Sequence, residues 1–178
     1  MELQVSSTKR VVEPEDIVAL YLQSHTRLRA FTVLAAGLAR VQGAKPELIV
    51  STAQRLYEYF TTVLPLHFRD EEESLARRLR GTDPAVDRAL DEMEAQHREH
   101  DATILELRER CAAMIKNPAQ LPAQAWLIAA LAANLTIELE EHLALEEKIL
   151  FPAVPRLINP DGRAAMVREL RQRRGACS

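Results

Sequence analysis

Two segments of this chain place a histidine and a glutamate four residues apart on what is otherwise the apolar face of a helix. HFRDEEESLARRL begins with His67 and carries Glu71, and HLALEEKILFP begins with His142 and carries Glu146. Positions i and i+4 lie one above the other on a helix, so each pair directs an imidazole nitrogen and a carboxylate oxygen toward one point. Burying such groups costs free energy unless a partner compensates for it. The fold must therefore bring both pairs to a partner.

The two pairs belong to an internal repeat. The interval along the chain from His25 to His67 equals the interval from His100 to His142. The shift that superimposes His25 on His100 also superimposes Glu71 on Glu146, Glu72 on Glu147 and Leu75 on Leu150. Self-similarity at a fixed spacing indicates a repeated structural unit, which here is one helical hairpin that occurs twice.

Apolar residues recur every three to four positions along four long segments, roughly 14–41, 46–80, 84–115 and 122–156, and along a short one at roughly 160–173. Gly43 and Gly81 stand where helices are expected to end, and Asp83 and Asn159 are the predicted N-caps of the helices that follow them. The connections are short, which favours antiparallel neighbours. We predict an all-α fold: an antiparallel up-down-up-down four-helix bundle built from two repeated helical hairpins, plus a short C-terminal helix.

The expected organisation is an N-terminal extension at 1–13, the bundle at 14–156, and the short helix and tail at 157–178. Pro14 precedes the first helical segment. Three further prolines, Pro65, Pro152 and Pro155, lie inside the second and fourth segments. Each is expected to kink its helix or to end it early.

Composition and charge exclude several classes of function. The formal net charge of −3 gives no general attraction to nucleic acid or to an anionic membrane. The longest uncharged run, 123–137, is too short to span a bilayer. The two cysteines, Cys111 and Cys177, do not make a disulfide framework, and the first residues do not resemble a signal peptide, so we expect a cytoplasmic protein. Partner proteins and the oligomeric state cannot be read from the sequence.

All the histidines fall on the predicted inward stripes, together with the two glutamates of the repeated pairs. Imidazole nitrogen and carboxylate oxygen are ligands that borderline metals accept. If both carboxylates bridge two ions and an oxo or hydroxo group joins them, about eleven of the twelve positions of two octahedral ions are filled. The open position suits a small molecule such as O2 or NO. The candidate metal ligands are His25, His67, Glu71, His97, His100, His142 and Glu146.

The pattern resembles the hemerythrin-like HHE cation-binding domain family, whose mark is a lone histidine followed by HxxxE on the next helix, twice. Here the matching residues are His25 with HFRDE, and His100 or His97 with HLALE followed by EKILFP, over roughly 14–156. The resemblance implies a non-heme di-iron centre in a four-helix bundle, with Glu71 and Glu146 as the bridging carboxylates. Oxygen-carrying hemerythrins have HxxxH on the third helix and HxxxxD on the fourth, whereas this chain has HxxH and HxxxE, which leaves the third-helix ligands open.

Three kinds of function are compatible with such a site. The first is a binding or sensing protein that takes O2, NO or peroxide for sensing, stress response or iron handling. The second is a di-iron enzyme acting on peroxide or NO. Repair of iron–sulfur clusters is a less suitable role, because relatives with that role commonly carry a cysteine-bearing N-terminal segment and 1–13 contains no cysteine. The third is a structural zinc or mononuclear metal site, because imidazole and carboxylate also bind zinc tightly.

Other features allow two interpretations. Tyr21 lies one turn before His25 and is interpreted as a core tyrosine, although its position would also suit a metal ligand or a donor to one. Glu72 and Glu147 are suited either to hydrogen bonding with ligand imidazoles or to a solvated helix face. Glu94 and His97 form one ExxH unit of the ferritin-like kind, but that site needs two such units, and Leu139 stands where the second glutamate would be.

Overall fold

The computed structural model describes residues 16–41 and 43–175, and its regular elements in these ranges are all helical, which confirms the all-α prediction there. The first element is α1, Ile17–Leu38. The second long segment contains α2 (Pro46–Glu58), α3 (Leu64–Asp70) and α4 (Arg77–Leu79), separated by π-helical turns at Tyr59–Val63 and Glu71–Ala76. It is followed by α5 (Pro84–Lys116) and a 3₁₀ turn at Pro118–Gln120. The last elements are α6 (Leu121–Leu145), a π-helical turn at Glu146–Leu150, α7 (Phe151–Leu157) and α8 (Pro160–Gly175).

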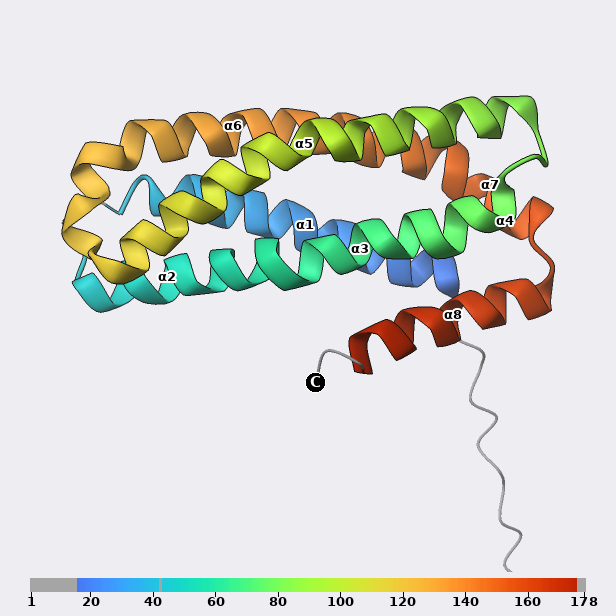
Figure 1. The fold of residues 1–178 in the computed structure, drawn as a ribbon, viewed down its shortest axis with the longest axis horizontal. Coiled ribbons are helices and arrows are strands. Elements are labelled where there is room, and N and C mark those ends of the chain that lie inside the picture. The colour runs from blue at the N-terminus through green and yellow to red at the C-terminus, as the bar shows by residue number, and fades with distance from the viewer. Residues whose placement is uncertain (1–15, 42, 176–178) are drawn as a thin grey trace, which may run out of the picture.

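Four long helical segments lie side by side, and α8 lies along one end of them (Figure 1). The connections after α1, α4 and α5 alternate between the two ends of the molecule (Figure 1). α5 packs against both α2 and α6, and α1 packs against α6. None of the helices in the described ranges is both long and apolar enough to cross a membrane. The predicted extension at 1–13, together with Pro14 and Cys177, lies outside the described residues.

The helix boundaries follow the predicted signals. Asp83 accepts a hydrogen bond from the backbone N–H of Ala85 (2.7 Å), and Asn159 accepts one from that of Gly162 (2.8 Å), which confirms both as N-terminal caps. Gly43 and Gly81 have φ angles of 82° and 79°, in the left-handed region that only glycine adopts without strain.

Pro65 and Pro152 do not end their helices, whereas α7 ends at Leu157, two residues after Pro155. A proline lacks the N–H that would bond to the carbonyl four residues earlier, and its ring would clash with that carbonyl. Before Pro65, the N–H of Leu64 instead bonds to the carbonyl of Tyr59, and before Pro152, the N–H of Phe151 bonds to that of Glu146, five residues back in each case. The turn is widened by one residue, so the helix continues through the proline.

The apolar core is divided into two parts along the bundle. One part lies toward the α1–α2 and α5–α6 connections and includes Leu38, Leu56 and Leu107. The other lies toward the α4–α5 connection and α8, and includes Leu79, Leu90 and Val154. Along each long segment, the histidines fall between residues of the first part and residues of the second. The candidate ligands therefore form a polar layer between two apolar layers.

Ionic contacts attach α8 to the second long segment. The buried carboxylate of Asp70 accepts hydrogen bonds from Arg173 (2.6 Å) and Arg174 (2.7 Å). Glu169 of α8 in turn accepts hydrogen bonds from Arg78 (2.5 Å) and Ser74 (2.6 Å). Because Asp70 directly precedes Glu71, these contacts also restrain the backbone beside a candidate ligand.

The layered core predicts different costs for two leucines of the same helix. Leu107 is fully buried, whereas Leu105 is 52% exposed. We expect Leu107→Ala to lower the free energy of unfolding by about 2–5 kcal/mol, because it leaves a cavity, and Leu105→Ala to change it by no more than about 0.5 kcal/mol. Chemical denaturation of the two variants measures both values. Equal effects would show that the described packing of α5 is wrong.

Candidate metal centre

Six of the seven candidate ligands come together in the layer between the two apolar parts. His25, His67, Glu71 and Glu146 form one group in which the potential ligand atoms all lie within 4.8 Å of one another. His97 and His142 form a second group of the same kind with the same two glutamates. The two groups thus share both carboxylates, which is the arrangement that two adjacent ions with bridging carboxylates require.

Each of the four long segments contributes an imidazole to this layer. His25 comes from α1, His67 from α3, His97 from α5 and His142 from α6. Glu71 and Glu146 are each the first residue of a π-helical turn, and these two turns start at equivalent positions of the internal repeat. π-Helical turns are rare and occur often at functional sites.

The distances between the side chains fit coordination of a shared ion. His67 Nε2 lies 3.0 Å from Glu71 Oε1, and His25 Nε2 lies 3.0 Å from Glu146 Oε2. Two atoms that each lie about 2.1 Å from one ion, at right angles, are about 3.0 Å apart. The other carboxylate oxygen of Glu71, Oε2, lies 3.3 Å from His97 Nε2. Glu71 therefore presents one oxygen to each group.

These polar atoms have no hydrogen-bond partner among the described residues. The unsatisfied atoms are Nε2 of His25, His67, His97 and His142, and both carboxylate oxygens of Glu71 and Glu146. The six side chains are between 0% and 4% exposed, so water does not cover them. Buried polar groups normally have partners, because leaving one unsatisfied costs free energy. Metal ions would satisfy all eight atoms at once, so the donor set fits the proposed cofactor.

Outer hydrogen bonds orient three of the imidazoles. Nδ1 of His25 lies 2.8 Å from Glu147 Oε1, and Nδ1 of His97 lies 2.7 Å from Glu72 Oε1. With Nδ1 donating, the lone pair of Nε2 faces the other ligands. Of the two interpretations of Glu72 and Glu147, the structure therefore favours hydrogen bonding to imidazoles.

Gln96 has the same role toward the third imidazole. Its Oε1 lies 3.1 Å from Nδ1 of His142, whereas Nδ1 of His67 has no partner among the described residues. Sequence reasoning missed Gln96, because its position directly before His97 gives no sign that it contacts a histidine on another helix.

His100 lies beside the two groups but belongs to neither. It is 2% exposed, and its ring stands perpendicular to that of His142, with the centroids 5.5 Å apart. Burial lowers its pKa to about 4. The structure brings His97 into the second group, and ligation by His100 remains a prediction.

The surrounding aromatic side chains separate the site from solvent. Phe68 stacks on the ring of His97 with centroids 4.0 Å apart, and Phe151 packs 5.0 Å from the ring of His25. Tyr21 is buried and its hydroxyl donates to the backbone carbonyl of Asp70 (2.9 Å), which favours the interpretation as a core residue. Glu94 bonds to Arg80 instead of entering the layer, so the ferritin-like arrangement is not formed.

The charges in the layer depend on one another. Burial lowers the pKa of His25, but the negative carboxylates of Glu146 and Glu71 beside Nε2 outweigh burial and raise that pKa to about 10. For His97 the same opposition, with Glu71 as the main partner, raises the pKa to about 9. Burial lowers the pKa of His142 to about 3, and burial together with the charge of Glu71 raises the pKa of Glu146 to about 7. At neutral pH the metal-free layer therefore holds protons on His25 and His97.

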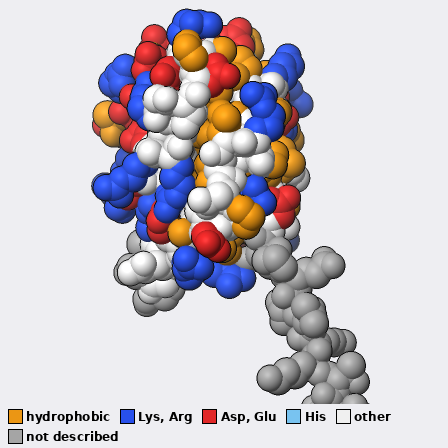
Figure 2. Space-filling view, turned by 90° about the vertical axis from the view of Figure 1, so that its right-hand side faces the viewer, with side chains coloured by type: hydrophobic (Ala, Val, Ile, Leu, Met, Phe, Trp, Pro, Cys, Tyr) orange, Lys and Arg blue, Asp and Glu red, His pale blue; other side chains and the backbone are white. Residues whose placement is uncertain are grey.

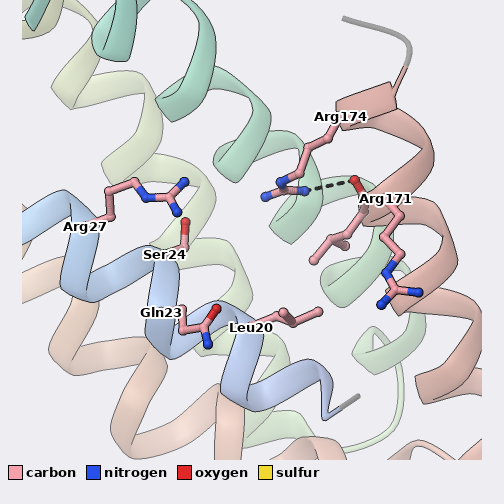
Figure 3. Close-up of a pocket in the computed structure, with 7 residues that line it drawn as sticks. Leu20, Gln23, Ser24, Arg27, Arg171 and Arg174 are labelled. Atoms are coloured by element: carbon pink, nitrogen blue, oxygen red, sulfur yellow. Dashed lines mark hydrogen bonds between the residues drawn. The ribbon is translucent and has the colours of Figure 1, made fainter. Parts of the chain in front are cut away.

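One end of the bundle and one hollow of the described surface can be compared with the ligand layer. On the end of the bundle drawn in Figure 2, acidic and basic side chains are interspersed, and no histidine is visible among the coloured residues. A hollow between α1 and α8 is lined by Ser24, Arg27, Arg171 and Arg174 (Figure 3). Arg174 there donates to the carbonyl of Leu170 (2.9 Å), and the guanidinium groups are spread along the hollow rather than directed at one point. None of the residues that line it belongs to the two ligand groups.

Comparison with known proteins bears on the same residues. A family model described as the hemerythrin HHE cation-binding domain matches residues 16–172, which contain every candidate ligand. No curated protein and no solved structure matches the chain.

Because His25 and His97 are protonated in the metal-free layer, we predict that metal binding depends on pH. A metal must displace the protons that His25 and His97 hold below about pH 9, so loading releases protons and the affinity falls as the pH falls. Between pH 8 and pH 6 we expect the affinity for Co²⁺ to fall by about tenfold per pH unit for each proton released. Calorimetric titration in buffers of different ionisation enthalpy counts the protons. An affinity that does not change with pH would contradict the described charge state.

Proposed function

The chain belongs to the hemerythrin HHE cation-binding domain family, and from this premise we propose that it holds two non-heme iron ions and binds a small molecule, O2, NO or peroxide, at them. Metal binding is the family's described property, and the groups of histidine and glutamate are suited to it. The two ions, their identity as iron and the small-molecule ligand are the proposed part. The proposal includes the antiparallel up-down-up-down order of the two hairpins.

The observation that carries the proposal is the sharing of Glu71 and Glu146 by both ligand groups. One ion would be held by His25 and His67, and the other by His97 and His142, with the carboxylates common to both. This gives each ion four protein ligands, fewer than an octahedral ion accepts, so positions remain for an exogenous ligand. Iron at such a site would supply reversible ligand binding and electron transfer to that ligand.

The residues of the chain prepare the site for this role. Glu147, Glu72 and Gln96 fix the orientation of three imidazoles. Phe68 and Phe151 exclude water from the ligand layer, which strengthens the interaction of the carboxylates with cations. The open positions favour binding or sensing, and turnover of peroxide or NO is the enzymatic alternative that uses the same residues.

Metal analysis and absorption spectroscopy test the proposal. The protein purified in air is expected to contain two irons per chain and to show the near-ultraviolet and visible bands of a coupled di-ferric pair, which change when NO or peroxide is added. A catalase-type assay separates peroxide turnover from binding. One zinc ion per chain and no visible band would contradict the proposal and support a structural metal site.

Replacement of one shared carboxylate tests its bridging role. We expect Glu146→Ala to lose at least one of the two metal ions and to be less stable than the parent protein, because the buried histidines lose the negative charge beside them. Glu141→Ala, which changes an exposed glutamate of the same helical segment, is the matched control and should retain both ions. Metal counting by atomic emission measures the outcome. Two ions retained by Glu146→Ala would show that Glu146 does not bridge.

A further inference from the structure

The two metal positions differ in what lies behind their histidines. In the first position, the carboxylate that contacts His25 belongs to Glu147, and in the second, the carboxylate that contacts His97 belongs to Glu72. These two glutamates are equivalent under the internal repeat, and their distances to the imidazoles, 2.8 Å and 2.7 Å, are nearly the same. Any difference between the two positions must therefore come from the surroundings of the glutamates.

Arg29 distinguishes the two glutamates. Its guanidinium donates to Glu147 Oε1 (2.9 Å), which is the same oxygen that contacts Nδ1 of His25. Two further nitrogens of Arg29 bond to the carboxylate of Glu140 at 2.9–3.2 Å, so Glu140 and Glu147 share the positive charge of the guanidinium. The described residues place no arginine or lysine in an ion pair with Glu72.

The sequence contains the same asymmetry. One turn after His25 stands Arg29, whereas one turn after His97 stands an acid, Asp101. The position equivalent to Arg29 under the repeat is occupied by the buried Ile104. A positive charge thus lies near His25 on α1, whereas the corresponding positions of α5 hold an acidic residue and an apolar residue.

We propose that Arg29 makes the two metal positions inequivalent, so that the position of His97 and His142 binds a divalent cation first and the position of His25 and His67 binds it more weakly. This inference rests on the proposed pair of ions. A carboxylate that accepts a hydrogen bond from an imidazole increases the basicity of that imidazole toward a metal. Arg29 neutralises the carboxylate of Glu147, so His25 receives less of this effect than His97.

The outer partners of the other two imidazoles, those of His67 and His142, also favour tighter metal binding at the second position. Nδ1 of His142 is held by Gln96, whereas Nδ1 of His67 has no partner among the described residues. An imidazole without an outer partner is less well oriented, and loss of outer partners typically lowers metal affinity by about 10- to 100-fold. The first position therefore has one imidazole whose outer carboxylate is paired with an arginine and one imidazole without an outer partner. Arg29 is a positioning residue, because it acts on the metal through Glu147 and His25.

Anaerobic titration of the metal-free protein with Co²⁺ tests the inference. The parent protein should bind two ions in two separate steps, and a crystal loaded with one equivalent should show anomalous scattering between His97 and His142. The second step fills the position of His25 and His67. Arg29→Gln, which removes the positive charge, should raise the affinity of this second step by about tenfold, so that the two steps have similar affinities. Arg29→Lys retains the charge and should keep them apart.

Two further variants serve as controls. Arg27→Gln removes the same charge from the exposed face of the same helix, and it should leave both steps unchanged. Glu140→Gln removes the competing partner of Arg29, which then acts more fully on Glu147, so the second step should become weaker. The inference is overturned if the two steps have equal affinity in the parent protein, or if Arg29→Gln weakens the second step, as expected of a residue that only holds Glu147 in place. Binding of fewer than two ions by the parent protein would instead overturn the proposed function, and the inference with it.

Discussion

The structure depends on the burial of two carboxylates and four imidazoles whose oxygen and Nε2 atoms face one another. Eight polar atoms in this layer lack hydrogen-bond partners among the described residues, and the side chains are shielded from water. In the metal-free protein, the protons held by His25 and His97 neutralise part of the charge of the two carboxylates. The layer lies between two apolar cores. Until cations bind, the packing of these cores offsets the free-energy cost of burying the polar layer.

The main elements of this arrangement could be predicted from the sequence because they depend on local spacing. The histidine and glutamate of each HxxxE pair share a helix face whatever the neighbours are, and the repeated interval between histidines fixes the equivalent histidine on the preceding helix. The caps at Asp83 and Asn159 are also local, since each is satisfied by a backbone N–H two or three residues later. The range matched by the family model contains all of these residues.

The details that the sequence did not determine depend on packing between helices. The repeat pairs His25 with His100, yet His97 is the histidine of α5 that enters the ligand group. Which of these two histidines faces the other ligands depends on how α5 is oriented about its own axis, and no local sequence pattern specifies that orientation. The same holds for Gln96, which reaches a histidine on another helix, and for Glu72 and Glu147, whose partners lie on neighbouring helices.

The π-helical turns connect this local spacing to the shared site. Glu71 and Glu146 each begin such a turn, and the backbone N–H of each bonds to the carbonyls three and four residues earlier, so the α-helical turn that holds HxxxE is intact up to the glutamate. The extra residue that follows rotates the rest of the helix by about 100°, which changes the face that its apolar residues present. In the fourth helical segment, the widened turn also accommodates Pro152. The π-helical turn thus keeps the carboxylate directed at the ligand layer while Leu75 and Leu150 remain in the adjoining core. Because the turn occurs at equivalent points of both repeats, it is associated with the ligands and not with the proline alone.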